Sequence, residues 1–193
     1  MIRVAEERDL GAMLEIYRPY VENTTVSFEY TVPTEGEFLE RFRETTAQFP
    51  WIVWEADGEI LGYAYASRPF QRQAYWWCAE PSIYVMSAAQ GHGIGKKLYT
   101  ALEELLKLQG YLVLYAWVTG ENTGSVRFHE RLGYKISMEL EKCGYKLGRW
   151  CGLVWMEKRL NYVENPMDFP TSWGSIRQDE QKICDILYNL SLS

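Results

Sequence analysis

The chain has 193 residues, 47% of them hydrophobic and 24% charged, which is the composition of a globular domain rather than of a disordered or membrane-embedded protein. Its formal charge of −6 at pH 7 argues against a general nucleic-acid binder, because such proteins present a basic surface. Met1–Arg8 carries charges where a signal peptide needs its apolar core, and no window has the apolar length of a membrane span. We therefore expect a cytoplasmic protein that contacts neither nucleic acid nor membrane and has a small-molecule partner.

Cysteine and histidine residues are too few and too scattered to predict a metal site. No two cysteines form a C-x-x-C pair, and the histidines are His92 and His129. In a cytoplasmic protein the thiols are expected to be reduced. These thiols belong to Cys78, Cys143, Cys151 and Cys184.

The first part of the chain predicts a strand followed by two helices. Ile2–Ala5 has the pattern of a short strand, and Asp9 is placed to cap the helix that follows it. After a loop-like stretch, Thr34 and Glu37 have the spacing of a capping box for a helix over residues 35–43. We expect these two helices to border a substrate pocket.

A hairpin and a further strand come next. Trp51–Ala56 and Ile60–Ser67 are β-rich and flank Asp57-Gly58, a strong hairpin signal, so they should pair antiparallel. Tyr75–Met86 predicts another strand, in which Glu80-Pro81 should interrupt regular pairing because proline has no N–H.

The glycine-rich stretch Gln90–Lys96 stands between that strand and an amphipathic helix over residues 97–109. Its three alternating glycines, Gly91, Gly93 and Gly95, allow several backbone N–H groups to point outward at the helix start, an arrangement that binds phosphate. The spacing does not fit a P-loop, which needs four residues between its glycines and a Ser or Thr after its lysine. It also lacks the G-x-G-x-x-G order of a dinucleotide-binding turn. A glycine turn that merely caps the helix is the remaining alternative.

The last elements complete a layered fold. Tyr111–Thr119 predicts a buried strand, Ser125–Leu132 a short helix, and residues 134–141 and 153–159 two more strands. Helices and strands in this order predict a mixed α/β sheet in three layers.

The chain changes character after residue 160. Asn161–Gly174 contains Pro166 and Pro170 and has no regular pattern. Beyond it, apolar residues at helical spacing predict a C-terminal amphipathic helix that docks on its own domain or on a partner subunit. They are Ile176, Ile183, Ile186, Leu187 and Leu190.

Gln90, Gly93 and Gly95 match the pattern Gln/Arg-x-x-Gly-x-Gly/Ala, which resembles the acetyl-coenzyme A (acetyl-CoA) pyrophosphate loop of the GNAT N-acetyltransferases. Further stretches narrow the resemblance to the phosphinothricin acetyltransferase-like branch. They are Thr25–Phe28, Phe49–Trp51, Gly62–Ala66, Ala74-Tyr75, Ala79-Glu80, Ser82–Val85, Ser125–Tyr134, Gly144–Lys146 and Gly148–Trp150. The resemblance implies a three-layer GNAT domain over residues 1–160 and a C-terminal helical extension over residues 161–193. It also implies acetyl-CoA as the acetyl donor and a homodimer, which is common in this branch.

The implied reaction is transfer of an acetyl group to a primary amine. An ammonium has no lone pair, so a base must take a proton before or during the attack. The family pattern places this base at Glu80, acting directly or through a water. The nearby Tyr75, Trp76, Trp77 and Tyr84 make an apolar setting that would raise the pKa of its carboxyl. A surface glutamate without a catalytic role is the alternative.

Two further groups complete the implied chemistry. His129 stands where many GNAT enzymes carry a Tyr that protonates the leaving thiolate, and an imidazole can also act as an acid. It can equally be a structural histidine beside Phe128, and both interpretations stay open here. For the oxyanion, backbone N–H groups near Val85 are the expected donors.

The resemblance assigns acetyl-CoA binding to the end of the strand before the glycine-rich stretch, to that stretch, and to the turn at Asn122 and Ser125. The last two residues also fit an Asx-turn and a helix N-cap, and these roles are compatible. We favour a solvent-facing His92, with Lys96 better placed to meet phosphate charge. The complete set is Tyr84, Val85, Met86, Gln90, Gly91, His92, Gly93, Ile94, Gly95, Lys96, Asn122 and Ser125.

For the acceptor, the resemblance implies that Phe28, Arg72 and Tyr75 line the pocket. Phe70 departs from the family, since some members carry a Lys there, and Gly152 lies where Asp is frequent. Loss of that cation counts against phosphinothricin and leaves methionine sulfoximine, methionine sulfone or another small amino acid open.

The sequence therefore predicts an acetyl-CoA-dependent N-acetyltransferase of small amino-acid-like amines. One alternative is a non-catalytic acetyl-CoA-binding regulatory module, against which Glu80 argues because such a module has no need of that carboxyl. Another is a protein or peptide N-acetyltransferase, which would have an open acidic groove rather than a closed aromatic pocket.

Overall fold

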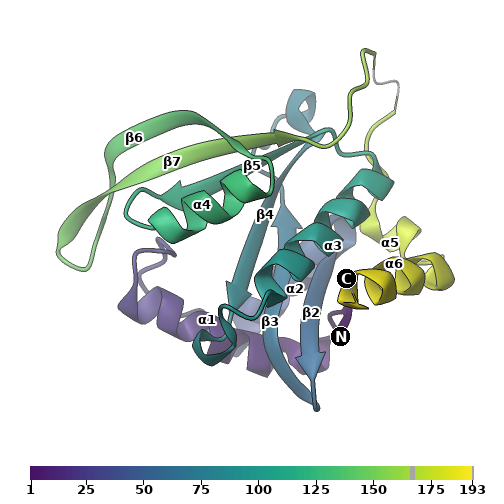
Figure 1. Cartoon of the computed structure of the whole chain (residues 1–193), viewed down its shortest axis with the longest axis horizontal. Coiled ribbons are helices and arrows are strands. Elements are labelled where there is room, and N and C mark those ends of the chain that lie inside the picture. Colours follow the sequence, from purple (N-terminus) through teal and green to yellow (C-terminus); the bar gives the residue numbers. More distant parts are fainter. Residues whose placement is uncertain (166–167, 193) are drawn as a thin grey trace.

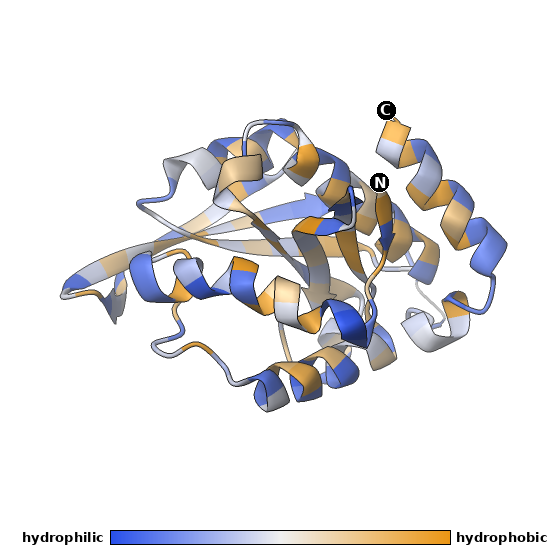
Figure 2. Cartoon of the chain, turned by 90° about the horizontal axis from the view of Figure 1, so that it is seen from below, coloured by the Kyte–Doolittle hydropathy of each residue, from blue (hydrophilic) through white to orange (hydrophobic). Residues whose placement is uncertain are grey.

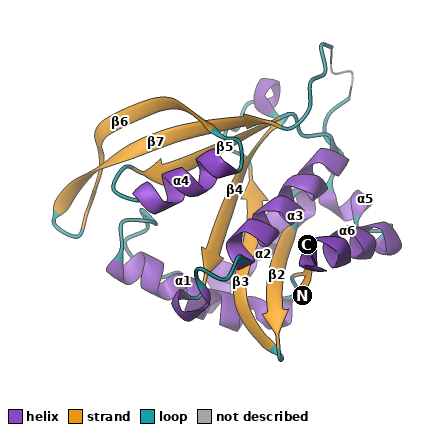
Figure 3. Cartoon of the chain, in the orientation of Figure 1, coloured by secondary structure: helices purple, strands orange, loops and turns teal. Residues whose placement is uncertain are grey.

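The computed structural model describes residues 1–165 and 168–192, and within them seven strands form one sheet with helices on both faces (Figure 1 and Figure 3). The strand order is β1-β2-β3-β4-β5-β7-β6, with β4 and β5 parallel and the other neighbours antiparallel. The strands are β1 (Ile2–Val4), β2 (Trp51–Ala56), β3 (Glu59–Ser67), β4 (Cys78–Val85), β5 (Val113–Thr119), β6 (Lys135–Lys146) and β7 (Arg149–Arg159). The helices are α1 (Leu10–Asn23), α2 (Glu35–Gln48), α3 (Ile94–Gln109), α4 (Thr123–Arg131), α5 (Trp173–Ile176) and α6 (Glu180–Leu192). The predicted mixed α/β sheet in three layers is confirmed.

Two apolar cores fill the space between the layers. One lies between the sheet and α1 with α2, and it includes Met13, Tyr17 and Trp51. The other lies between the sheet and α3, whose Leu98 and Leu102 are fully buried. Figure 2 shows apolar and polar residues alternating around these helices, as expected when one side of each helix packs on the sheet.

Local turn and capping signals are confirmed. Asp57 and Gly58 have φ values of +52° and +81°, the left-handed pair that a tight hairpin turn requires. The Glu37 N–H donates to Thr34 Oγ1 at 3.3 Å, and the Thr34 N–H donates to the Glu37 carboxylate at 2.7 Å. This capping box starts α2, which continues to Gln48, beyond the predicted end at residue 43.

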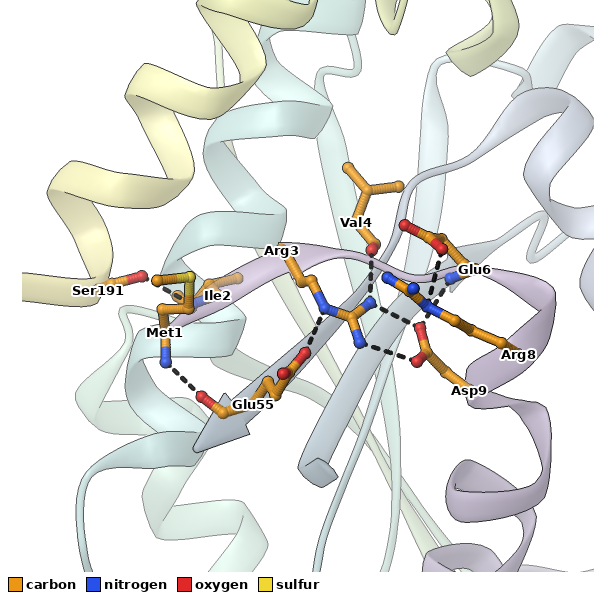
Figure 4. Close-up of polar contacts among 9 residues, drawn as sticks. All are labelled: Met1, Ile2, Arg3, Val4, Glu6, Arg8, Asp9, Glu55 and Ser191. Carbon is orange, nitrogen blue, oxygen red and sulfur yellow. Dashed lines mark hydrogen bonds and ion pairs between the residues drawn. The ribbon is translucent and has the colours of Figure 1, made fainter. Parts of the chain in front are cut away.

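Asp9 occupies the N-cap position of α1, as predicted, but its side chain makes no capping hydrogen bond to this helix. A short 3₁₀ turn precedes α1, so Asp9 already has helical backbone angles and its carboxylate reaches back toward the start of the chain. It accepts from the Glu6 N–H at 2.8 Å and from two nitrogens of Arg3 at 2.7 and 2.8 Å, while Arg3 Nε donates to Glu55 at 2.5 Å (Figure 4). Burial would raise the pKa of Asp9, but the Arg3 guanidinium and the Glu6 N–H together outweigh burial, and the pKa is lowered.

Strand lengths differ from the prediction at both sides of the glycine-rich stretch. The predicted strand from Tyr75 begins later, at Cys78, because residues 73–75 form a 3₁₀ turn. Strands β6 and β7 are longer than expected and form one hairpin, whose turn has Leu147 and Gly148 at φ +50° and +76°.

Strands β4 and β5 diverge after a short shared segment (Figure 1). They pair only at Cys78 with Val113 and at Ala79 with Leu114. On its other side β4 pairs with β3 without a break over Glu80–Val85. The interruption predicted at Glu80-Pro81 therefore affects the β5 side alone.

The face of β5, β7 and β6 opposite α3 and α4 carries exposed apolar side chains. Trp117, which pairs with Trp155 across β5 and β7, is 43% exposed, and Met138, paired with Trp155 on β6, is 42% exposed. Leu140 on β6 is also exposed, and the ring of Phe70 stacks on Trp155 with centroids 5.8 Å apart. We call these five residues the bare sheet face.

The C-terminal segment folds back onto α3 and β1. The predicted single helix is wrong in its start, because Ile176 belongs to the short helix α5 and a break separates it from α6. Ile183 and Leu187 of α6 are buried in the core that contains α3. The Ser191 hydroxyl accepts from the Ile2 N–H at 2.7 Å. Residues 166, 167 and 193, which include the Pro166 of the predicted irregular stretch, lie outside the described residues.

No helix in the described part of the chain is long and apolar enough to cross a membrane.

Candidate active site

A pocket of about 80 Å³ lies where β4 and β5 diverge. Consecutive residues of both strands line it, so side chains from both faces of the sheet reach the same space. Helix α4 and the connection after α1 supply the rest of the wall. The lining residues are Val26, Glu80, Pro81, Ser82, Ile83, Tyr84, Ala116, Trp117, Val118, Thr119, Asn122, Ser125 and His129.

Glu80 is the ionisable carboxyl of this pocket. Its side chain leaves β4 on the same face as Ser82 and Tyr84, the face that α1 covers farther along the strand. Within the described chain, its carboxyl has neither a hydrogen bond nor an ion pair. Burial therefore acts without compensation and raises the pKa of Glu80 from its ordinary value to about 7. A carboxyl with this pKa is half ionised at neutral pH and can accept a proton there.

His129 lies on the opposite side of the pocket and is engaged at both ring nitrogens. Nδ1 is 2.8 Å from the Ser125 carbonyl oxygen, which can only accept, so Nδ1 carries the hydrogen. Nε2 lies 3.0 Å from the Tyr99 hydroxyl, which then donates to it. Burial lowers the pKa of His129, although the Ser125 carbonyl favours its protonated form. The ring is therefore neutral at pH 7.

The glycine-rich loop presents backbone N–H groups at the start of α3. Gly91 and Gly93 both have φ of +81°, which side chains with a Cβ rarely adopt. Gly93 is the N-cap of α3, and no side chain caps this helix end, so its first N–H groups stay available to an anion. His92 and Lys96 are exposed beside the loop, while Ile94 is buried as the first residue of α3.

The end of β4 is linked to α1 by Tyr20, a residue without a sequence signal for the site. Tyr20 donates its hydroxyl to the Val85 carbonyl at 2.6 Å and accepts from the Val85 N–H at 3.4 Å. Gln90 donates to the same hydroxyl at 2.9 Å. The side chain of Tyr84 packs on Tyr20, with centroids 5.2 Å apart, and Met86 follows with its N–H bonded to β3. The backbone groups of Val85 on this side are thus occupied by Tyr20.

Asn122 and Ser125 lie together at the start of α4. The Ser125 N–H donates to Asn122 Oδ1 at 3.1 Å, so the predicted N-cap is confirmed. Both residues also line the pocket, on the side of His129.

The three residues expected for the acceptor do not line this pocket. Phe28 lies in the connection between α1 and α2, where its ring covers Gly144. Arg72 and Tyr75 are exposed in the β3–β4 connection, and the Tyr75 ring packs on Phe70 with centroids 4.7 Å apart. Val26 and Trp117 line the pocket instead. Neither has a local sequence signal, because their positions depend on how distant segments meet.

A family model described as "Acetyltransferase (GNAT) domain" matches residues 2–155. The chain belongs to the GNAT acetyltransferase family. It is 36% identical to a phosphinothricin N-acetyltransferase of Streptomyces viridochromogenes over 77% of this chain and 81% of that one. It is also 36% identical to a methionine sulfoximine/methionine sulfone acetyltransferase of Pseudomonas aeruginosa, over 83% and 94% of the two chains.

A solved structure supports the same assignment. The phosphinothricin acetyltransferase of Sinorhizobium meliloti in complex with acetyl-CoA has a TM-score of 0.82 and 34% identity, over 89% of this chain and 92% of that one. The predicted GNAT fold, the acetyltransferase class and acetyl-CoA as donor are confirmed.

We expect Glu80→Gln to stabilise the protein at high pH. The pKa of Glu80 is about 4.5 in the unfolded chain and about 7 in the folded protein. The free energy of unfolding of the wild type therefore falls as pH rises between these two values and stays lower above pH 7, whereas that of Glu80→Gln lacks this change. The difference corresponds to at most about 3 kcal/mol at pH 8 and vanishes below pH 4.5. Urea unfolding of both proteins at pH 4.5 and pH 8 measures it. Glu139→Gln, a change at an exposed residue of β6, is the control. Equal stability differences at both pH values would contradict the environment assigned to Glu80.

Proposed function

We propose that this GNAT enzyme acetylates the primary amine of a small amino-acid-like substrate, with Glu80 as the general base. The observation that carries the proposal is the unpaired Glu80 carboxyl, with its pKa of about 7, in the pocket between the diverging strands. The relatives named above support the acceptor class, since they act on phosphinothricin and on methionine sulfoximine or sulfone.

The two faces of the sheet separate donor from acceptor in this proposal. The glycine-rich loop and α4 would bind the pyrophosphate and the pantetheine arm of acetyl-CoA, using the free N–H groups at the start of α3 and the turn at Asn122 and Ser125. The thioester would then enter the pocket between β4 and β5 from the face of the sheet that α3 and α4 cover. The amine would enter from the face that carries Glu80.

Proton transfer and acyl transfer then follow from this placement. Glu80 takes a proton from the ammonium, directly or through a water, and the freed nitrogen attacks the thioester carbonyl. The new C–N bond forms, the C–S bond breaks, and coenzyme A leaves as a thiolate. The nitrogen, which still carries one proton more than the amide product, gives that second proton to the thiolate, so that coenzyme A ends as the free thiol. A thiol has a pKa of about 8.5, so the thiolate leaves without a dedicated acid. We propose that His129, neutral and bonded at both nitrogens, holds the pocket wall rather than protonating the thiolate.

The pocket favours an acceptor with an uncharged side chain. Among the lining residues there is no Lys or Arg, and Glu80 supplies negative charge. Phe70, where some relatives carry a cation, belongs to an aromatic cluster with Tyr75 and Trp155. An anionic phosphinate would find no cation in this pocket.

We expect release of free thiol from acetyl-CoA with methionine sulfoximine or methionine sulfone as acceptor, and lower kcat/KM with phosphinothricin. The assay panel also contains plain amino acids, a polyamine and a short peptide with a free N-terminus. Turnover confined to the peptide would overturn the acceptor class. Absence of turnover with every amine, despite measurable acetyl-CoA binding, would instead favour a non-catalytic module.

The pH dependence of kcat/KM tests the base. Because Glu80 must be ionised to accept a proton, kcat/KM should rise about tenfold per pH unit below 7 and level off above it. Glu80→Gln should lose roughly a hundredfold or more of kcat/KM together with that acidic limb. Glu139→Gln serves as the matched control. A Glu80→Gln enzyme with undiminished turnover would remove this residue from the mechanism.

We also propose that the protein is a homodimer that buries the bare sheet face. Its support is the exposure of Trp117, Met138 and Leu140 beside the outer edge of β6. Met138→Glu should convert the dimer to a monomer in light scattering after size exclusion, because it places a charge in the interface. Tyr188→Glu, on the exposed side of α6, should leave the dimer intact. A wild-type protein that is monomeric at tens of micromolar would refute the proposal.

A cytoplasmic location completes the proposal. It is supported by the donor, acetyl-CoA, and by the four cysteines, all of which are free. Recovery of the protein from an extracytoplasmic fraction would overturn it.

A further inference from the structure

The connection between α1 and α2 forms part of the pocket wall. We call residues 24–30 the wall loop. Thr25 and Ser27 are buried, each 6% exposed, whereas Val26 and Phe28 alternate with them and are 38% exposed. Val26 lines the pocket on the side of Glu80. The contacts that hold the buried Thr25 and Ser27 therefore also set the position of Val26 between them.

Three consecutive residues at the end of β6 contact the wall loop. Lys146 donates from Nζ to the Ser27 carbonyl at 2.6 Å. Tyr145 accepts at its backbone carbonyl from the Tyr30 hydroxyl. Gly144 lies under the Phe28 ring so closely that a Cβ on Gly144 would be 2.6 Å from Phe28 Cε2. The stretch Gly144-Tyr145-Lys146, which the family resemblance singled out without a role, thus meets the loop residue by residue.

The other side of the wall loop is anchored to the helices. The Ser27 hydroxyl lies 2.7 Å from the Tyr17 hydroxyl of α1, in a buried contact. Glu29 forms an ion pair with Arg41 of α2 at 2.8 Å. Ser27 is therefore held at its side chain by α1 and at its backbone by Lys146.

A buried ammonium is a costly way to make this contact. Lys146 is 3% exposed, and burial lowers the pKa of its ammonium although Glu29 lies near enough to favour the charge. An apolar side chain of similar length would fill the same space without the cost of removing a charge from water. What it would lack is the donor for the Ser27 carbonyl.

We propose that Gly144-Tyr145-Lys146 is a clamp that positions the acceptor side of the pocket, with Lys146 as its main positioning residue. The proposal rests on the acetyl transfer proposed above, because it assigns the clamp to the acceptor and not to acetyl-CoA. The clamp touches the wall loop, and among the described residues no hydrogen bond or ion pair joins it to the glycine-rich loop, so the KM values of the two substrates should respond differently to its loss.

Lys146→Met tests the clamp. It should raise the acceptor KM roughly tenfold or more, because the pocket wall shifts, while the KM for acetyl-CoA and the pH of half-maximal kcat/KM stay unchanged. Lys146→Arg keeps a donor and should recover part of the acceptor affinity. Lys135→Met, at an exposed lysine of the same strand, should behave as wild type. Equal increases in both KM values, or no change in either, would overturn the clamp.

Hydrogen exchange gives a readout that does not need turnover. Amides of residues 24–30 should exchange faster in Lys146→Met than in wild type, while those of α3 stay the same. If the wild type acetylates no amine, the proposed function fails. Separately, unchanged exchange of the wall-loop amides in Lys146→Met would refute the clamp. Faster exchange with an unchanged acceptor KM would show a stabilising contact without a positioning role and would also refute it.

Gly144→Ala provides a second variant in which Lys146 is intact. The added methyl group would displace the Phe28 ring, so the acceptor KM should rise here too. In a Phe28→Ala background the same change should add little, because the ring it displaces is absent. Additive effects of Gly144→Ala and Phe28→Ala would contradict the contact that the clamp requires.

Discussion

The divergence of β4 from β5 is the constraint on which the site depends. Parallel neighbours ordinarily continue their hydrogen bonds along their shared length, yet these two pair at only two positions. On its other side, β4 stays paired with β3 without a break over Glu80–Val85. The β3 side of β4 is therefore fully paired, while the β5 side opens into the pocket. Pro81, which has no N–H, stands two residues after the last shared pair, where its missing donor is tolerated.

Buried carboxylates elsewhere in the chain show how unusual the environment of Glu80 is. Asp9 is buried, at 5% exposure, but the Arg3 guanidinium binds both its oxygens and its pKa is lowered. Glu103 is buried against Lys158 at 2.6 Å, which opposes the rise in pKa that burial causes. Glu80 has no such cation. The other two carboxylates are paired with cations, whereas this one is left unpaired, at a cost in stability, at the position where we propose the proton acceptor.

A feature could be predicted from the sequence when the residues that form it lie close together along the chain. Signals within a few residues were sufficient for the hairpin turn at Asp57-Gly58, for the capping box at Thr34 and for the N-cap at Asn122. The glycine spacing predicted the loop before α3, and the family resemblance pointed to Glu80, which lines the pocket.

What the sequence did not predict depends on contacts between distant segments. Tyr20 meets Val85 across 65 residues, and Lys146 meets Ser27 across 119. Asp9 stands at the predicted N-cap position of α1, but its carboxylate binds Arg3, a charged residue outside the helix, instead of capping the helix. A sequence pattern shows that a residue is chemically suited to a role. Which residue it contacts depends on how distant segments pack together.

The C-terminal segment contacts α3, the helix that begins at the glycine-rich loop. The family match ends at residue 155, and α6 lies beyond it, packed on α3. Lys97, in the first turns of α3, donates to the Ser191 carbonyl at 2.9 Å, and its ammonium lies 5.5 Å from the Trp54 ring centroid. Anion binding at a helix start requires that the first turn be fixed, since frayed N–H groups no longer converge. Through Lys97, α6 contacts the turn that follows the glycine-rich loop, although no residue of α6 lines the pocket.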